Sequence, residues 1–328
     1  MATSSKEDAA DSRQHAMKPD VLIVGPMYQP TLDTLDREFT THKLWLAPDR
    51  KALLASCADR VRGIATTGFV GADAALIDAL PKLEIISSFG VGYDTVDVAA
   101  ARRRNVVVTN TPGVLNDAVA DLAIGLMIAA ARRIPQGDRF VREGKWIKQE
   151  LPLARHVTGK RLGIVGLGRI GQAIAKRAAG FDLKISYHSR HRVRESPFAY
   201  YERLVDLARN SDFLIAIVPG GNETHHLIDE EVMRALGPKG ILVNVARGSV
   251  VDEKALVKCL QEEALGGAAL DVFEEEPEVP EALFTMDNVV LQPHVGSATH
   301  ETRTAMGQLT IDNLVAHFAG KPVLTPVT

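Results

Sequence analysis

RLGIVGLGRIGQAIAKRAAG, residues 161–180, carries a strand pattern and a helix pattern joined by a glycine-rich turn. The turn, GLGRIG, matches G-x-G-x-x-G: Gly166 permits a tight turn, Gly168 lets the backbone approach a pyrophosphate, and Gly171 lets the helix pack on the strand. A helix that starts at Arg169 and Ile170 would direct its first amides at the phosphates. The letters also fit a plain strand-to-helix turn, but the flanking patterns favour a Rossmann dinucleotide-binding unit.

Short apolar runs alternate with helical patterns from residue 20 onward, which is typical of parallel α/β sheets. The first set of strand patterns is VLIVGP (21–26), RGIATT (62–67), LEIISSFG (83–90) and VVVTNT (106–111). The second set is RLGIVG (161–166), LKISYHS (183–189), FLIAIV (213–218), ILVNVA (241–246), AALDV (268–272) and NVVLQP (288–293). We therefore predict two α/β units, each built on a doubly wound parallel sheet.

A long apolar helix pattern over residues 116–133 begins the second unit, with Asn116 or Asp117 available as its cap. It is apolar around most of its circumference, so we expect it to be buried on several sides. The last helix pattern (299–320) is expected to return to the first unit. We therefore predict a Rossmann coenzyme domain over 116–296, inserted into a flavodoxin-like substrate domain over 18–115 and 297–328. A disordered tail over 1–17 is expected to precede them.

The composition narrows the function classes. The formal net charge is −3 and there is no long basic run, so we expect neither a nucleic-acid partner nor an acidic membrane surface. The longest apolar stretch (118–131) is shorter than the ~20 residues of a membrane span and contains Asp121. Cys57 and Cys259 show no paired or metal-type spacing, which favours a reducing compartment. We expect a soluble, cytoplasmic protein.

The strand after the glycine loop bears on the choice of dinucleotide. Sites for NAD place an acidic residue about 20 residues after the glycines, where it binds the ribose 2′-hydroxyl. Here the strand ends in YHSRHR (187–192), with no acid. Ser189 and Arg190 instead offer a hydroxyl and a cation that suit a 2′-phosphate. A solvated basic loop is the alternative, but the pattern favours NADP(H), with NAD(H) as the second coenzyme.

Three chemically active residues follow the ends of consecutive predicted strands. Arg247 comes after ILVNVA, Glu276 after AALDV, and His294 after NVVLQP. Ligands of open α/β sheets bind at the carboxyl ends of strands, so we expect the three to share a site. Taken singly, Arg247 could pair with Asp271, Glu276 could lie in a solvated acidic loop, and His294 could be an ordinary core or surface histidine.

Four motifs together carry a family resemblance: GLGRIG (166–171), NVARG (244–248), ALDVFEEEP (269–277) and PHVGSAT (293–299). In this order and spacing they resemble the D-isomer-specific 2-hydroxyacid dehydrogenases over essentially all of residues 20–328. The chain looks most similar to the NADPH-preferring glyoxylate/hydroxypyruvate reductases. Supporting segments are ADAALIDALPKLEIISSFGVGYD (72–94), DAVADLAIGL (117–126), YHSR (187–190) and HFAGKPVLTPV (317–327).

The resemblance implies a role for each residue of the predicted site. Arg247 would hold the substrate carboxylate and carbonyl, while Glu276 and His294 would form the acid/base pair. Backbone amides of Val91 and Gly92, and the hydroxyl of Ser297, would add substrate contacts. Arg247 and His294 would also contact the coenzyme, and the remaining assigned coenzyme contacts are Leu167, His191, Val218, Pro219, Val245, Ala246, Asp271 and Gly296.

Other functions stay open at this point. A phosphoglycerate or erythronate-phosphate dehydrogenase would have the same fold, but the first unit shows no additional phosphate-binding cluster. Dinucleotide-sensing corepressors share the fold and even the Arg, Glu and His, and would bind coenzyme without steady turnover. The adjacent His225 and His226 lie in a polar loop with no further ligand cluster, so we assign no metal. We expect a homodimer built around the helix of residues 116–133.

Overall fold

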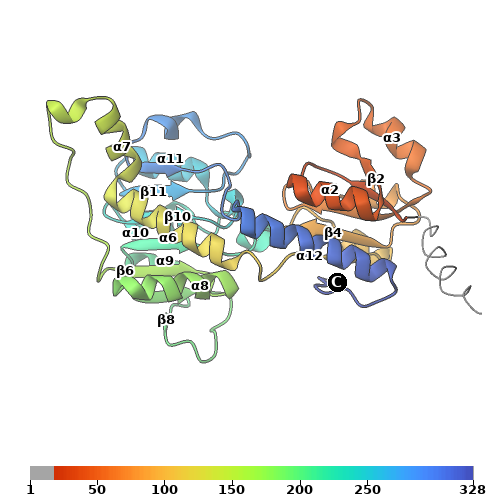
Figure 1. Cartoon of the computed structure of the whole chain (residues 1–328). Helices are drawn as coiled ribbons and strands as arrows, with labels where there is room; N and C mark the ends of the chain where they lie inside the picture. The colour runs from red at the N-terminus through yellow and green to blue at the C-terminus, as the bar shows by residue number, and fades with distance from the viewer. Residues whose placement is uncertain (1–17, 328) are drawn as a thin grey trace, which may run out of the picture. The chain divides into compact units, whose positions relative to one another are not determined.

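The computed structural model describes residues 18–327 (Figure 1). Residues 18–112 and 303–327 form one compact unit, here the first unit, and 113–302 form the second unit. The tail predicted over residues 1–17 lies outside the described residues. Within the described part of the chain, no helix has both the length and the apolar character that crossing a membrane requires.

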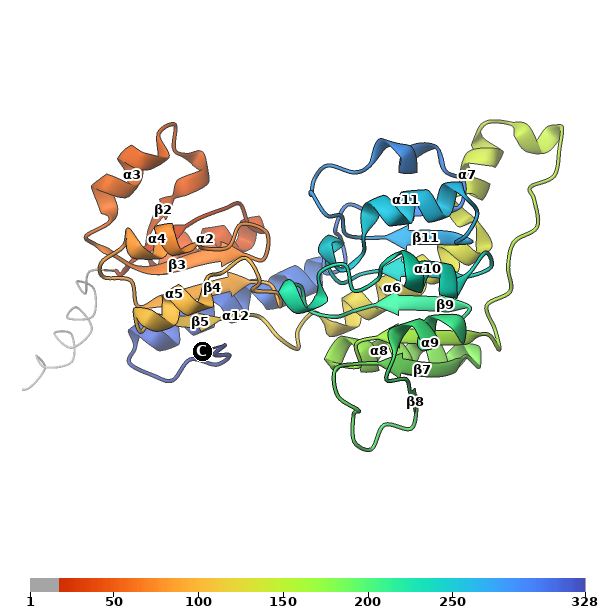
Figure 2. The ribbon, with the colours of Figure 1, turned by 180° about the vertical axis from the view of Figure 1, so that it is seen from behind.

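The first unit is built on a five-stranded sheet in the order β2-β1-β3-β4-β5, and every neighbouring pair is parallel. Both faces of the sheet are covered by helices, which a parallel sheet requires (Figures 1 and 2). Its strands are β1 (Asp20–Ile23), β2 (Thr40–Lys43), β3 (Val61–Thr67), β4 (Ile85–Phe89) and β5 (Val107–Thr109). Its helices are α2 (Gln29–Glu38), α3 (Arg50–Cys57), α4 (Ala74–Asp78), α5 (Val98–Arg103) and most of α12 (His300–Phe318).

The second unit is built on a seven-stranded parallel sheet in the order β12-β11-β10-β9-β6-β7-β8. Strand β6 has β7 on one side and β9 on the other, so the chain order reverses there. The carboxyl ends of strands at such a switch point are where open α/β sheets bind ligands. The strands are β6 (Arg161–Val165), β7 (Lys184–His188), β8 (Ala199–Tyr200), β9 (Phe213–Ala216), β10 (Ile241–Asn244), β11 (Gly267–Leu270) and β12 (Val289–Leu291).

Helices cover both faces of this second sheet. Helices α6 and α8 lie on one face, and α9, α10 and α11 lie on the other (Figures 1 and 2). The bounds are α6 (Asn116–Arg132), α7 (Ile134–Arg142), α8 (Arg169–Ala178), α9 (Leu204–Arg209), α10 (Glu230–Leu236) and α11 (Glu253–Gln261). The predicted fold class, two parallel-sheet α/β units, is confirmed.

Helix α6 is the long apolar helix that the sequence predicts over residues 116–133. Helix α6 packs on α8, β10 and β11 of its own unit, which buries much of its apolar surface. The predicted cap is wrong, because the helix starts at Asn116 and its N-cap residue is Leu115, with no side-chain cap. Asp117 therefore lies inside the first turn, where its carboxylate accepts a hydrogen bond from Arg177 of α8 at 2.9 Å.

Each of the ten predicted strand segments overlaps an observed strand, but β2 and β8 were not predicted. Strand β2 reads TTHK and is only partly buried at a sheet edge, so it lacks an apolar pattern. Strand β8 has two residues, too few to show any alternation. Both edge strands owe their conformation to pairing with a neighbour rather than to their own sequence.

Candidate active site

The glycine loop has the shape that a pyrophosphate needs. Gly166 has φ +101°, and a Cβ there would lie 2.6 Å from the carbonyl oxygen of Ile217. A Cβ on Gly171 would lie 2.1 Å from the carbonyl oxygen of Gly166, so helix and strand approach closely. At Gly168 a Cβ would meet no described atom within 4 Å, which leaves open space beside the loop. Helix α8 starts immediately afterwards with no side-chain cap, so its first amides remain available for an anion.

The other predicted coenzyme residues follow neighbouring strands of this sheet. Val218 and Pro219 come after β9, and the side chain of Val218 lies beside Gly166. Val245 and Ala246 come after β10, and both are buried. Leu167 is buried within the glycine loop itself. These residues therefore surround the carboxyl ends of β6, β9 and β10, at the switch point of the sheet.

The loop after β7 carries the basic residues that were predicted to select the coenzyme. The Ser189 hydroxyl donates to the His191 carbonyl at 2.6 Å. The Arg190 guanidinium pairs with Glu223 at 2.6 Å, and both side chains are about three-quarters exposed. Glu223 was not anticipated, because it lies 33 residues further along the chain. An ion pair this exposed contributes only about 0–1 kcal/mol, so a phosphate can readily displace Glu223 from Arg190.

The Arg247 loop is shaped by Asn244, the last residue of β10. The side-chain Nδ2 of Asn244 donates to the Arg247 carbonyl at 2.9 Å, and its side-chain oxygen accepts from the Ala246 backbone amide at 3.1 Å. Asn244 is 1% exposed, so these hydrogen bonds form in a buried setting. Arg247 itself is half-buried and donates from Nη1 to the Ala246 carbonyl at 2.8 Å. Asn244 belongs to the NVARG motif, but nothing in the sequence predicts this role for it.

Glu276 and His294 lie against each other. The Nδ1 atom of His294 is 3.0 and 2.8 Å from the two carboxylate oxygens of Glu276. The Phe273 amide also donates to Glu276, at 3.0 Å. Burial opposes the charge of Glu276, but the hydrogen bonds from His294 and Phe273, with the charges of His294 and Arg247, hold the pKa of this carboxyl below its usual value. Glu276 is therefore ionised at neutral pH. Because Nδ1 of His294 faces Glu276, Nε2 lies on the side of the ring that points away from Glu276.

Asp271 anchors the loop that presents His294. Its carboxylate accepts from the Val295 amide at 2.7 Å and from the Gly296 amide at 2.8 Å, and its carbonyl accepts from the His294 amide at 2.8 Å. His294 has φ +51°, a conformation that these contacts stabilise. Burial raises the pKa of Asp271, while the two amides and the charge of His294 oppose that rise.

Glu253 is a buried acid that the sequence did not single out. It lies at the start of α11 and accepts from the Glu274 amide at 2.9 Å, which holds the loop that carries Glu276. Burial raises the pKa of Glu253; the Glu274 amide opposes this, and the charges of Glu274, Glu275 and Glu276 add to it. Its position directly after the N-cap of a helix resembles that of many solvated acids, so no local signal marks it.

The predicted substrate contacts lie in both units. Val91 and Gly92 follow β4 of the first unit and are half-buried, and the Val91 carbonyl accepts from the side-chain Nδ2 of Asn110 at 2.8 Å. Ser297 lies in the second unit, directly after the loop that Asp271 holds, and is also half-buried. Within the second unit, the structure thus brings Glu276, His294 and Asp271 together and places Arg247 after the neighbouring strand β10.

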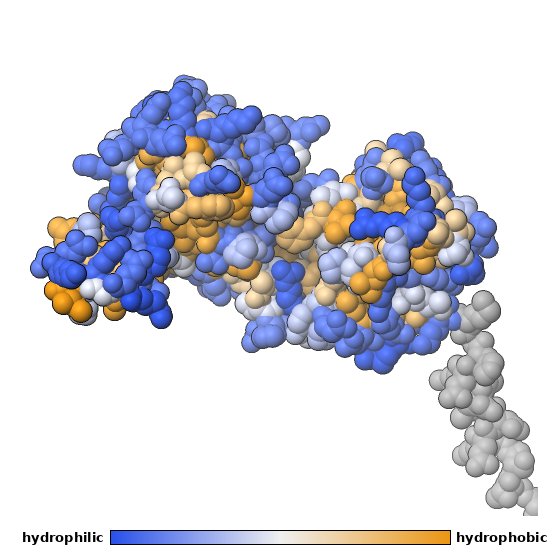
Figure 3. All heavy atoms as spheres, turned by 90° about the horizontal axis from the view of Figure 1, so that it is seen from above, coloured by the Kyte–Doolittle hydropathy of each residue, from blue (hydrophilic) through white to orange (hydrophobic). Residues whose placement is uncertain are grey.

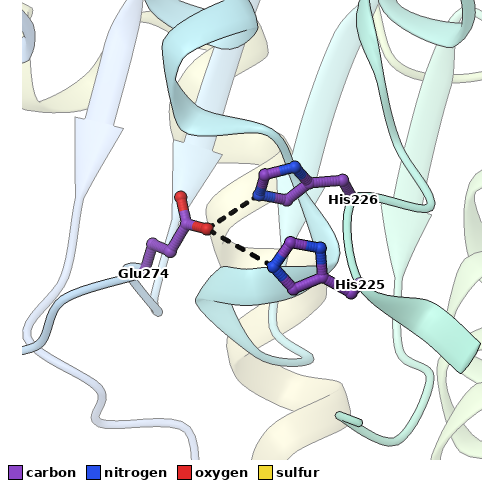
Figure 4. Close-up of side chains that lie close together, drawn as sticks. All are labelled: His225, His226 and Glu274. Atoms are coloured by element: carbon purple, nitrogen blue, oxygen red, sulfur yellow. Dashed lines mark hydrogen bonds and ion pairs between the residues drawn. The ribbon is translucent and has the colours of Figure 1, made fainter. Parts of the chain in front are cut away.

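The prediction that no ligand group accompanies His225 and His226 is wrong. Glu274, which lies 48 residues further along the chain, places a carboxylate oxygen 2.7 Å from Nε2 of His226 and 3.9 Å from Nε2 of His225 (Figure 4). The sequence could not reveal this cluster, because strand β10 lies between β9 and β11 and the two loops meet only through the order of strands.

A Rossmann unit with an acid–histidine pair beyond its strand ends defines a class of dehydrogenases, and comparison with known proteins identifies the class. The chain belongs to the D-isomer specific 2-hydroxyacid dehydrogenase family: residues 124–296 match the NAD-binding domain of that family. The protein is thus an oxidoreductase, and the predicted family is confirmed.

Several individual members of the family are similar to this chain over almost its whole length. A hydroxyphenylpyruvate reductase of Plectranthus scutellarioides is 52% identical over 307 residues, which are 94% of this chain and 98% of the relative. A glyoxylate/hydroxypyruvate reductase of Arabidopsis thaliana is 50% identical over the same shares of the two chains. An NADPH-dependent glyoxylate/hydroxypyruvate reductase of Sinorhizobium meliloti, solved with NADP and malonate, has a TM-score of 0.88 and 44% identity, and the match covers 95% of this chain and 97% of that chain.

Proposed function

We propose that this enzyme reduces small 2-oxo acids, glyoxylate and hydroxypyruvate, to D-2-hydroxy acids, with NADPH as the preferred coenzyme and NADH as the second. The observation that carries the proposal is the Glu276–His294 pair, which lies at the carboxyl ends of the same sheet as the glycine loop. The names of the relatives support the choice of substrates. The test is a kinetic panel of glyoxylate, hydroxypyruvate, pyruvate and hydroxyphenylpyruvate with each coenzyme.

The second unit fits a nicotinamide dinucleotide, because the open space at Gly168 and the uncapped start of α8 suit a pyrophosphate. When bound, the reduced coenzyme supplies the hydride. Val218 and Pro219 after β9, and Val245 and Ala246 after β10, would line the rest of its site. Arg190 would leave Glu223 to bind a 2′-phosphate, which favours NADPH.

Three side chains bind the substrate, donate its proton and orient the proton donor. A 2-oxo acid presents a planar carboxylate, and the forked guanidinium of Arg247 can bind it through two parallel hydrogen bonds. During reduction the keto oxygen gains negative charge and needs a proton, which protonated His294 donates from Nε2. Ionised Glu276 accepts a hydrogen bond from Nδ1 and so fixes the orientation of the ring. In the oxidative direction, neutral His294 takes the proton back.

Arg190→Asp should shift coenzyme preference from NADPH toward NADH. The substitution removes the cation that would pair with the 2′-phosphate and supplies an acceptor for the ribose hydroxyl. The ratio of kcat/KM for the two coenzymes measures the effect. Glu223→Gln is the matched control, because it removes the partner of Arg190 but leaves the cation, and should keep the preference for NADPH. A wild-type enzyme that already prefers NADH would contradict this reading of the loop.

Glu276→Gln should lower reductive activity at neutral pH and change the acid side of its pH dependence. Burial opposes the charge of Glu276, but the hydrogen bonds from His294 and Phe273 hold the pKa of this carboxyl below its usual value, so it stays charged until the pH falls below the ordinary range of a glutamic acid. Glutamine keeps the size of the side chain and one hydrogen bond but has no charge and does not titrate, so the variant should be less active and should lack the loss of activity that protonation of Glu276 causes in acid. Turnover against pH at saturating coenzyme measures both effects. Glu275→Gln, one residue away, serves as the control, and equal profiles for wild type and Glu276→Gln would return Glu276 to a solvated acidic role.

We propose a homodimer, and we extend its surface from the helix of residues 116–133 to the segment that follows it. The apolar composition of α6 is explained by packing within its own unit, so it requires no partner. Strongly exposed apolar residues instead lie just beyond α6, at Trp146, Ile147 and Leu153, which are 71%, 89% and 99% exposed. Figure 3 shows hydrophobic atoms at the outer end of the protruding segment that contains α7. A second copy of the chain would remove them from water.

The dimer is tested by light scattering of the purified protein at micromolar concentration. The expected mass is twice that of one chain, and Ile147→Glu together with Leu153→Glu should reduce it to the mass of a monomer, because charged groups would be buried without partners. Lys148→Glu changes charge at the same turn without removing apolar surface and should stay dimeric. A wild-type monomer at this concentration would rule the dimer out.

The other candidate functions are separated by activity. A dinucleotide-sensing corepressor would bind coenzyme tightly without steady turnover of any 2-oxo acid, whereas a phosphoglycerate-type dehydrogenase would act on phosphorylated substrates only.

We place the enzyme in the cytoplasm, since Cys57 and Cys259 are both buried free thiols, as a reducing compartment permits.

A further inference from the structure

The His225, His226 and Glu274 cluster, here the histidine cluster, lies outside the groups that the proposed reaction uses. His225 and His226 end the short turn after β9, and Glu274 follows β11. The two imidazole rings stack, with centroids 3.9 Å apart and planes at 28°. Both Nε2 atoms face the same carboxylate oxygen of Glu274 (Figure 4). Three ligand atoms from two loops therefore converge on one point, all within 4.8 Å of one another.

A hydrogen bond explains only part of this arrangement. His226 lies 2.7 Å from the Glu274 oxygen, which is a normal hydrogen-bond distance. His225 lies 3.9 Å away, too far for a hydrogen bond, yet its Nε2 faces the same oxygen. The backbone holds the pair of histidines in place, because the His226 amide donates to the Ser249 carbonyl at 2.8 Å.

The electrostatic surroundings favour a cation. Asp252 places a carboxylate oxygen 4.0 Å from Nδ1 of His226. Glu253 accepts a hydrogen bond from the Glu274 backbone amide at 2.9 Å. Glu275 and Glu276 follow Glu274 directly in the chain and add further negative charge nearby. These carboxylates would attract a positive ion placed between the histidines and Glu274.

We propose that the histidine cluster is a binding site for a divalent transition-metal ion, with Nε2 of His225, Nε2 of His226 and a carboxylate oxygen of Glu274 as ligands. Zinc lies about 2.0–2.2 Å from nitrogen and oxygen ligands, which puts neighbouring ligand atoms of a tetrahedral site about 3.3 Å apart. The observed separations from the Glu274 oxygen, 2.7 and 3.9 Å, lie on either side of that value. Rotation of the His225 ring, whose side chain is 56% exposed, together with a small shift of the Glu274 carboxylate away from His226, would bring the three atoms into position.

The donor set determines which ions the site takes. Two imidazoles and one carboxylate suit zinc, copper and nickel, whereas calcium and magnesium prefer oxygen ligands alone. The fourth position faces solvent, so water would complete the coordination and the affinity should be lower than that of a closed four-ligand site. A bound ion would tie the turn after β9 to the loop after β11.

Zinc titration of the full chain tests the proposal. Tag-free protein is stripped with a chelator and titrated with zinc chloride in a non-coordinating buffer, with calorimetry as the readout. The expected result is one saturable site per chain in the wild type and in the control His156→Gln, which removes an exposed histidine elsewhere on the second unit. His225→Gln, His226→Gln and Glu274→Gln should each weaken binding by at least about tenfold, since even loss of an outer-shell partner costs about 10–100-fold.

Electron paramagnetic resonance with copper(II) supplies a second readout that reports the ligands directly. The wild type should show coupling to two imidazole nitrogens, and His225→Gln should show coupling to one. Because the His225 side chain is more exposed than buried, this variant should fold even if His226→Gln does not. Saturable zinc binding of equal strength in the double variant His225→Gln/His226→Gln, or no saturable binding in the wild type, would overturn the proposal.

Discussion

Replacing His294 by alanine should lower the reductive kcat by about 10²–10⁴-fold, the usual contribution of a positioned general acid. The structure positions His294 from two sides. A carboxylate oxygen of Glu276 lies 2.8 Å from Nδ1, and the Asp271 carboxylate accepts hydrogen bonds from the amides of Val295 and Gly296, the next two residues. With the ring removed, the developing charge on the substrate oxygen has no donor in this position. Single-turnover rates at saturating coenzyme measure the loss.

A loss of activity in His294→Ala has two possible causes, the missing imidazole and a changed conformation of its loop, and a second variant separates them. His294 has φ +51°, a conformation that asparagine adopts more readily than alanine. His294→Asn should therefore keep the loop and its hydrogen bonds to Asp271, yet lose as much activity as His294→Ala. Coenzyme binding, followed by the fluorescence of the reduced nicotinamide, should stay near the wild-type value in both variants. Activity within tenfold of the wild type in His294→Asn would remove His294 from the reaction.

Arg247→Lys should lower kcat/KM for a 2-oxo acid by about 10–100-fold, mainly through a higher KM. Lysine keeps the charge but cannot form two parallel hydrogen bonds, and the loss of one hydrogen bond to a charged group costs about 1.5–3 kcal/mol. The Arg247 loop should keep its shape, because Asn244 holds its backbone and not its side chain. Steady-state kinetics with glyoxylate and hydroxypyruvate measure the change.

A substrate that lacks the carboxylate provides the control for Arg247. Methylglyoxal offers a reducible carbonyl without the group that the guanidinium is proposed to bind, so the wild type should reduce it slowly and Arg247→Lys should reduce it equally slowly. A loss of the same size on methylglyoxal as on glyoxylate would show that Arg247 acts on the carbonyl or on the loop instead of the carboxylate.

Much of the fold was predictable because its signals are local. The spacing of Gly166, Gly168 and Gly171 follows from contacts between a strand and the helix that comes directly after it, and both crowded glycines show those contacts. The ten predicted strands are short apolar runs, and in all of them except β7 most of the strand residues are buried. Motif order was equally informative, since Arg247, Glu276 and His294 each follow a strand end, and parallel strands place their carboxyl ends on one edge.

The sequence by itself thus determined the two α/β units, the glycine loop, the family and the residues of the acid–histidine pair. Only the tertiary structure decided which side chains surround them: Glu223 pairs with Arg190, Asp271 holds the His294 loop, and Glu274 faces two histidines, of which His226 lies 48 residues earlier in the chain. The physical reason is how far apart in the chain the interacting residues lie. Propensity, periodicity and glycine spacing arise between residues close in the chain, whereas these contacts depend on the order of strands in a sheet, which brings loops together only after the chain has folded.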